Sequence, residues 1–130
     1  MLHDDTIITF MLFKYANSFK KIDKIGLVHF VFKDSASAES EKFATPERYR
    51  NTCLSFINYC ELIFKHAENT TMSRQEVFWA FRTWIIRSKC KNYEPILQRN
   101  IDLARAIYND PFVNNDDKRT VKNAFSSYIK

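Results

Sequence analysis

Apolar residues recur every three or four positions through most of the second part of the chain, a spacing that predicts amphipathic α-helices. The first of these helices has the clearest start signal, with Thr45 as N-cap and Pro46 in the first helical position. The next is expected to open at Ser73, because Ser73 and Glu76 form a capping box. Helices with such short connections should pack together as a bundle. Their expected extents are residues 46–67, 73–88, 95–108 and 115–129.

The first part of the chain has a different pattern. A helix is predicted from Thr6 to about Phe19, with Asp4 or Asp5 as its cap and as a favourable charge at the positive end of its dipole. Apolar residues occupy nearly the whole circumference of this helix, so it is expected to be buried on more than one side.

Residues 24–32, KIGLVHFVF, predict a β-strand, and the polar residues 34–42 that follow predict a loop. A single strand cannot satisfy its own ladder hydrogen bonds, so a partner sheet is expected from a missing segment or from another chain. The predicted fold class is therefore mainly α with one or two short β-strands. The predicted division is into residues 1–40, which hold the first helix and the strand, and residues 41–130, which form the helical bundle.

Composition limits the chemistry that this chain can perform. The 130 residues suffice for a single core, and Gly26 is the only glycine. A P-loop or a dinucleotide-binding loop needs several glycines, so neither is expected here. Cys53, Cys60 and Cys90 are an odd number of cysteines without metal-ligand spacing, so reduced thiols packed in a core are predicted, with no metal site in the chain. Seven residues of helix separate Cys53 from Cys60, too far for a disulfide.

The formal net charge of +5 comes entirely from residues 41–130. The basic residues of this part are scattered and accompany no nucleic-acid-binding motif, so nucleic acid is not expected as a partner. One basic group lies beside Trp79 and Trp84. It either contacts an anionic membrane surface or forms a solvated helix end whose charges suit the dipole. The group consists of Arg82, Arg87, Lys89 and Lys91.

An acidic pair, Asp4-Asp5, is followed by Thr6 and a hydrophobic helix containing Tyr15-Ala16. Next come the basic turn Phe19-Lys20-Lys21-Ile22 and a strand that ends near Ser35-Ala36-Ser37. This order resembles the back part of a family 2 glycosyltransferase catalytic domain. The resemblance covers roughly residues 1–40, and the helical tail is similar to the variable C-terminal region of such enzymes. One departure is Phe32, where many members of the family have a histidine three residues before the first serine.

The resemblance implies the truncated back part of a GT-A-like α/β domain followed by a four-helix tail. Asp5 would be the catalytic base, Asp4 its acidic neighbour, and Ser35 and Ser37 part of a loop on the acceptor side. A base of this kind removes the proton of the acceptor hydroxyl as its oxygen attacks the anomeric carbon. The chain contains no Asp-x-Asp sequence. The nucleotide-sugar and a divalent cation, Mg or Mn, would therefore bind in a preceding half of the parent enzyme.

By this interpretation the chain is the C-terminal part of a family 2 glycosyltransferase of cell-surface polysaccharide biosynthesis. It would transfer sugar to a glycan or lipid-linked acceptor, and would be inactive alone. Its expected location is cytoplasmic, with peripheral contact at the inner face of the membrane. The alternative is a small non-catalytic helical protein-interaction module, in which the first helix and the strand form a homodimer interface.

Overall fold

The computed structural model describes residues 4–16 and 42–130, and in these residues the chain is mainly α-helical, as the sequence predicts. It divides into two compact units, Met1–Thr52 and Cys53–Lys130. The helix α3 crosses this division. The helical elements are α1 Asp4–Tyr15, α3 Pro46–His66, α4 Thr71–Phe81, the π-helical segment η1 Arg82–Ile86, α5 Glu94–Tyr108 and α6 Asn115–Ala124.

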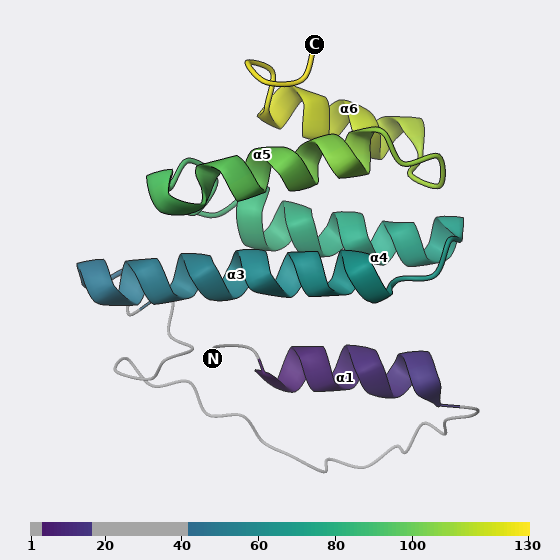
Figure 1. The fold of residues 1–130 in the computed structure, drawn as a ribbon, viewed down its shortest axis with the longest axis horizontal. Helices are drawn as coiled ribbons and strands as arrows, with labels where there is room; N and C mark the ends of the chain where they lie inside the picture. The colour runs from purple at the N-terminus through teal and green to yellow at the C-terminus, as the bar shows by residue number, and fades with distance from the viewer. Residues whose placement is uncertain (1–3, 17–41) are drawn as a thin grey trace. The chain divides into compact units, whose positions relative to one another are not determined.

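The second unit is an antiparallel helical bundle. Figure 1 shows α3, α4, α5 and α6 one after another, each reversing the direction of the helix before it. Aromatic contacts join these helices. The ring of Trp84 lies 4.8 Å from that of Phe56 on α3, and the stacked rings of Phe81 and Phe125 are 5.9 Å apart. The largest fully buried apolar side chains include Tyr59, Phe81, Phe125, Ile57, Ile85, Ile96 and Ile107.

The helix α3 begins where the sequence predicts, and α5 begins one residue before its predicted start at Pro95. The hydroxyl Oγ1 of Thr45 accepts a hydrogen bond of 3.1 Å from the backbone N–H of Arg48, which confirms Thr45 as the N-cap of α3. The helix α5 begins at Glu94, with Pro95 in its first turn, and ends at Tyr108 before Asn109. Strong local signals thus fixed both starts, because a capping side chain or a proline sets the chain direction without help from distant residues.

The first helix differs from its prediction. It begins at Asp4 and ends at Tyr15, so the acidic pair belongs to its first turn and does not precede it. The predicted end, Phe19, lies outside the described residues. The predicted burial of this helix on more than one side is also not observed. Three of its apolar residues, which we name the α1 stripe, are exposed. Its members lie at helical spacing and are more than half exposed: Ile8 (58%), Leu12 (66%) and Tyr15 (67%).

The start of α4 is a second correction. The predicted cap was Ser73, but the helix begins at Thr71 with Thr70 as its N-cap. The hydroxyl of Thr70 accepts a hydrogen bond of 3.1 Å from the backbone N–H of Ser73. Ser73 therefore donates to the cap, because the chain is already helical at this position.

The predicted helix 73–88 ends in a π-helical segment that the sequence did not reveal. The backbone N–H of Arg87 donates to the carbonyl of Arg82, five residues earlier, at 2.9 Å. The last helix, in turn, is shorter than predicted. It starts at Asn115 but ends at Ala124, after which Tyr128 and Ile129 donate backbone hydrogen bonds to the carbonyl of Phe125. This turn still buries Ile129, with 5% exposed, so the apolar spacing continues beyond the helix itself.

The predicted strand at residues 24–32 lies outside the described residues, and so does nearly all of the predicted loop 34–42. Within the parts of the chain that the structure describes, no helix combines the length and the apolar character needed to cross a bilayer.

Candidate functional site

The structure places the acidic pair at the start of a helix. Asp4 and Asp5 are the first two residues of α1, and Tyr15, from the Tyr-Ala pair, is its last. The glycosyltransferase resemblance predicts a helix directly after the acidic pair, whereas the structure includes the pair in the first turn of the helix. The other two predicted site residues, Ser35 and Ser37, lie outside the described residues. Their place in a loop on the acceptor side therefore stays a prediction.

The predicted basic group is divided by the fold. The Nζ of Lys91 donates a hydrogen bond of 3.1 Å to the carbonyl of Ala124, at the C-terminal end of α6, and lies 5.9 Å from the ring centroid of Phe125. The guanidinium of Arg82 lies 5.5 Å from the ring centroid of Phe78. Both cations thus have partners within the bundle. Arg87 and Lys89 are both exposed, and Lys89 also has an interaction partner.

Arg82 also acts on an acidic residue of α6. Burial, the largest influence, raises the pKa of Asp117, while a hydrogen bond from Asn114 and the charge of Arg82 act in the opposite direction. The backbone N–H of Asp117 donates to the side-chain oxygen of Asn114, the N-cap of α6, at 2.8 Å. Arg82 therefore contributes to the electrostatics of the α6 start, a structural role that the linear charge pattern did not indicate.

The two tryptophans beside the basic group also differ. Trp84 packs in the bundle, with its ring 4.8 Å from that of Phe56 and 5.8 Å from that of Tyr59. Trp79 is 52% exposed on α4. Only Trp79 of the two therefore combines a large aromatic surface with direct access from outside.

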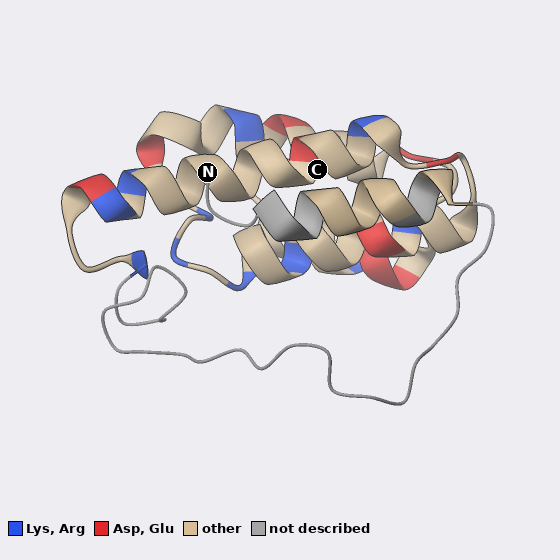
Figure 2. Cartoon of the chain, turned by 90° about the horizontal axis from the view of Figure 1, so that it is seen from below, with Lys and Arg blue, Asp and Glu red and all other residues tan. Residues whose placement is uncertain are grey.

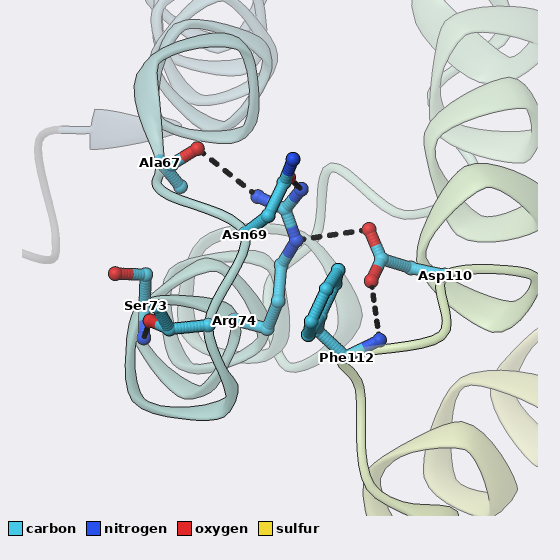
Figure 3. Close-up of polar contacts among 7 residues, drawn as sticks. Ala67, Asn69, Ser73, Arg74, Asp110 and Phe112 are labelled. Atoms are coloured by element: carbon cyan, nitrogen blue, oxygen red, sulfur yellow. Dashed lines mark hydrogen bonds and ion pairs between the residues drawn. The ribbon is translucent and has the colours of Figure 1, made fainter.

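Sequence reasoning missed a buried polar cluster around Arg74 (Figure 3). Its Nε lies 2.9 Å from Oδ2 of Asp110, and the side chains are only 8% and 7% exposed. The two terminal nitrogens donate to the carbonyl of Ala67, at 3.4 Å, and to Oδ1 of Asn69, at 2.7 Å. Oδ1 of Asp110 in turn accepts a hydrogen bond of 2.8 Å from the backbone N–H of Phe112. One cation thus joins the α3–α4 connection, α4 and the α5–α6 connection.

This cluster has a structural role, because it connects three segments of the fold. Almost every polar atom of Arg74 and Asp110 faces a partner inside the protein, and the guanidinium lies 5.0 Å from the ring centroid of Phe64. Buried charges that are paired in this way satisfy one another, and leave little capacity for a ligand. No sequence signal could have found the pair, because Arg74 lies in α4 and Asp110 in the distant α5–α6 connection, and each occurs in an ordinary polar context.

The three cysteines are free and buried, as predicted. Cys53 of α3 and Cys90 hydrogen-bond to each other through their side chains, a contact between distant positions that the sequence did not indicate. That bond raises the pKa of the Cys53 thiol and lowers that of Cys90. Burial raises the pKa of the Cys60 thiol. Cys53 and Cys60, which are buried thiols with raised pKa values, should therefore be poor nucleophiles.

Among residues 4–16 and 42–130, no three His, Cys, Asp or Glu side chains come together in a way that could hold a metal ion. The nucleotide-sugar and the divalent cation expected for a complete parent enzyme are not assigned to any described residue.

Comparisons with known proteins do not distinguish the glycosyltransferase interpretation from the interaction-module alternative. No protein-family model matches the chain, and neither a curated protein nor a solved structure matches it. Any assignment of function therefore depends on the residues themselves.

Proposed function

We propose that this chain is the C-terminal part of a family 2 glycosyltransferase that transfers sugar from a nucleotide-sugar to a cell-surface glycan or a lipid-linked acceptor. In this proposal Asp5 is the general base and Asp4 its acidic neighbour. Asp5 accepts the proton of the acceptor hydroxyl while the oxygen attacks the anomeric carbon. The rest of the parent domain supplies the site for the nucleoside diphosphate and the divalent cation.

The observation that carries the proposal is the acidic pair at the start of α1, in the order acidic pair, hydrophobic helix and Tyr-Ala. Acidic residues in the first turn of a helix are favoured by its dipole. A rigid helix is also a suitable support for a base, because catalysis requires the carboxylate to be held in one place. The helical bundle of the second unit is consistent with a C-terminal tail in such an enzyme.

A second candidate is the non-catalytic interaction module, and one observation favours it. The three members of the α1 stripe are each more than half exposed. Three large apolar side chains at positions 8, 12 and 15 form a continuous ridge on one side of a helix. Such a ridge is suited to a partner, which in the first proposal is the rest of the catalytic domain and in the second is another copy of the chain.

The first experiment is to determine the mass of the native gene product, by immunoblot of source cells with an antibody against residues 94–124. A band well above 15.5 kDa supports a longer parent enzyme. A single band at 15.5 kDa would contradict the proposal that the chain is part of a longer polypeptide. The second candidate is then tested by light scattering of the wild type and of Leu12→Ser, which should shift a dimer towards monomer.

The role of Asp5 is tested in the longer enzyme with Asp5→Asn. Release of UDP from a panel of UDP-sugars is measured with Mg²⁺ or Mn²⁺ present. A general base contributes about 10²–10⁴-fold to the rate, so a loss of that size is expected. Asp116→Asn on α6 is the matched control, because the Asp116 side chain is 90% exposed. Full activity of Asp5→Asn would show that Asp5 is not the base.

A further inference from the structure

Two of the three buried cysteines contact each other. Cys53 belongs to α3, and Cys90 lies in the connection between η1 and α5. Both side chains are 0% exposed, and the two thiols hydrogen-bond to each other. Side chains that hydrogen-bond in this way converge, which is the first requirement for a disulfide. Cys53 and Cys90, named here the thiol pair, are therefore candidates for a covalent link.

Hydrogen bonds and a ring contact hold the thiol pair in place. The backbone N–H of Cys90 donates to Oγ of Ser88, and the carbonyl of Cys90 accepts from Nδ2 of Asn100, each at 3.0 Å. The ring of Trp84, in η1, lies 4.8 Å from that of Phe56, which follows the first member of the thiol pair by about one turn of α3. The connection that carries Cys90 is thus fixed against α3, and the contact between the two thiols follows from the fold.

Cys60 is a buried cysteine outside this pair. It is 1% exposed and lies on α3, seven residues after Cys53. Seven residues of helix span about 10 Å, more than the roughly 7 Å that a disulfide allows between Cα atoms. Burial, followed by the charges of Glu61 and Cys90, raises the pKa of Cys60. Cys60 therefore interacts with Cys90 through charge, without a thiol hydrogen bond among the described contacts, and provides a matched control.

We propose that Cys53 and Cys90 form a reversible disulfide when the chain reacts with hydrogen peroxide. The thiolate of Cys90 attacks one peroxide oxygen, the O–O bond breaks, and hydroxide leaves and takes up a proton, so Cys90 becomes a sulfenic acid. The sulfur of Cys53 then attacks the sulfur of Cys90, the S–O bond breaks, and the hydroxyl leaves with the Cys53 proton as water. Two thiols thereby lose two electrons, and one peroxide is reduced to two water molecules. A thiol reductant reverses the reaction by exchange.

The surroundings of the two thiols set the order of these steps. The hydrogen bond from Cys53 lowers the pKa of Cys90 against the opposite effect of burial, and Ser88 lowers it further. A lowered pKa raises the thiolate fraction, so Cys90 attacks first. The hydrogen bond to Cys90, burial and the charge of Cys90 raise the pKa of Cys53. Oxidation of Cys90 removes the first and the last of these influences, and Cys53 then acts as the second nucleophile.

A small uncharged oxidant suits this site. Cys90 lies in a connection between helical elements, and connections open locally at a lower free-energy cost than helix interiors. Lys and Arg positions are interleaved with Asp and Glu positions along the described helices and do not form one continuous stripe (Figure 2). An anionic oxidant is therefore not guided to Cys90 by a basic stripe on these helices. Hydrogen peroxide is neutral and small enough to enter through a local opening.

The test exposes the folded 130-residue chain to hydrogen peroxide, at a concentration that fully oxidises N-acetylcysteine, and removes the oxidant with catalase. Thiol counting in denaturant should then find a fall from three free thiols to one, and dithiothreitol should restore all three. Peptide mapping without reductant, after the remaining thiols are blocked with N-ethylmaleimide, should find Cys53 joined to Cys90. In Cys53→Ala no disulfide should form, and dimedone should trap the sulfenic acid on Cys90.

The matched control is Cys60→Ala, which removes a similarly buried thiol outside the pair. It should still lose two thiols and form the link between Cys53 and Cys90, so its peptide map decides the pairing even if Cys53→Ala does not fold. Circular dichroism shows which variants are folded. The proposal is overturned if the folded wild type keeps three free thiols, if the disulfide involves Cys60, or if a non-reducing gel shows chains joined into dimers.

Discussion

Arg74 and Asp110 form a buried ion pair, with Nε of the arginine 2.9 Å from Oδ2 of the aspartate. Arg74 lies in the first turns of α4, and Asp110 follows the end of α5. The pair and its hydrogen bonds to Asn69 and Ala67 join segments that are distant in sequence (Figure 3). The bundle therefore depends on a specific polar contact in addition to its apolar core.

Removal of one partner should destabilise the fold strongly. Arg74→Met leaves the Asp110 carboxylate buried without its cation, a loss of about 3–5 kcal/mol in the free energy of unfolding. Urea denaturation measures this loss. Arg119→Met is the control, because Arg119 and Asp116 form a pair of 3.7 Å with side chains 73% and 90% exposed, where a change of about 0–1 kcal/mol is expected. A loss below about 1 kcal/mol in Arg74→Met would contradict the structural role of the pair.

The N-cap of α4 can be assigned by two single substitutions. Thr70→Ala removes the oxygen that accepts the backbone N–H of Ser73, and should cost about 1 kcal/mol of stability. Ser73→Ala should have little effect, because Ser73 contributes only its backbone N–H to the cap. Thermal unfolding of the two variants measures the difference. The reverse order of stabilities would restore Ser73 as the capping residue.

This cap illustrates how far the sequence could predict the fold. Thr45-Pro46 and Pro95 set the starts of α3 and α5 through local geometry, so pattern alone located both helices. At α4 two start signals compete, Thr70 and the Ser73–Glu76 pair. The contact of Arg74 with Asn69, in the connection before the helix, accompanies the earlier start. A sequence pattern contains no information on such a contact.

Neither the π-helical segment nor the end of α6 was predicted from the sequence, and the two reasons are related. An added residue in one turn disturbs helical periodicity only locally, and Phe81 and Ile85 still fit an ordinary helix. At the C-terminus, Phe125 and Ile129 keep helical spacing while the chain between them turns. Periodicity therefore predicted which residues are buried better than it predicted the backbone that carries them.

For the candidate site, the sequence predicted a helix at the acidic pair, and the structure places Asp4 and Asp5 in its first turn. The linear pattern grouped four basic residues, but the fold directs Arg82 and Lys91 towards partners in the bundle. Such a division depends on rings and carbonyls from other helices. Charge positions alone could not have shown it.

A buried amide provides a third prediction. Asn100 is fully buried, and its Nδ2 donates to the carbonyls of Cys90 and Lys91 at 3.0 and 3.1 Å. Asn100→Leu should cost about 1–3 kcal/mol, because the carbonyls of Cys90 and Lys91 both lose this donor at a buried position. Gln98→Leu on the same helix is the control, because Gln98 is exposed and pairs only with Asp102. Equal stability of the two variants would exclude a structural role for the Asn100 hydrogen bonds.

The thiol of Cys60 should make the stability of the fold depend on alkaline pH. Burial raises its pKa above the ordinary value of 9.0, so the folded chain keeps the thiol proton when the unfolded chain loses it. The unfolded state then binds fewer protons, and the free energy of unfolding falls as pH rises above 9.0. The slope from one such group is at most about 1.4 kcal/mol per pH unit.

Comparison with Cys60→Ala isolates this contribution, because the titrations of the other groups are common to both proteins. At pH 7 the wild type should be the more stable, since alanine leaves a small cavity where Cys60 is only 1% exposed. Urea unfolding of both proteins should show this advantage shrinking between pH 9 and about pH 10. An advantage that stays constant over this range would mean that Cys60 ionises as readily in the folded chain as in the unfolded one.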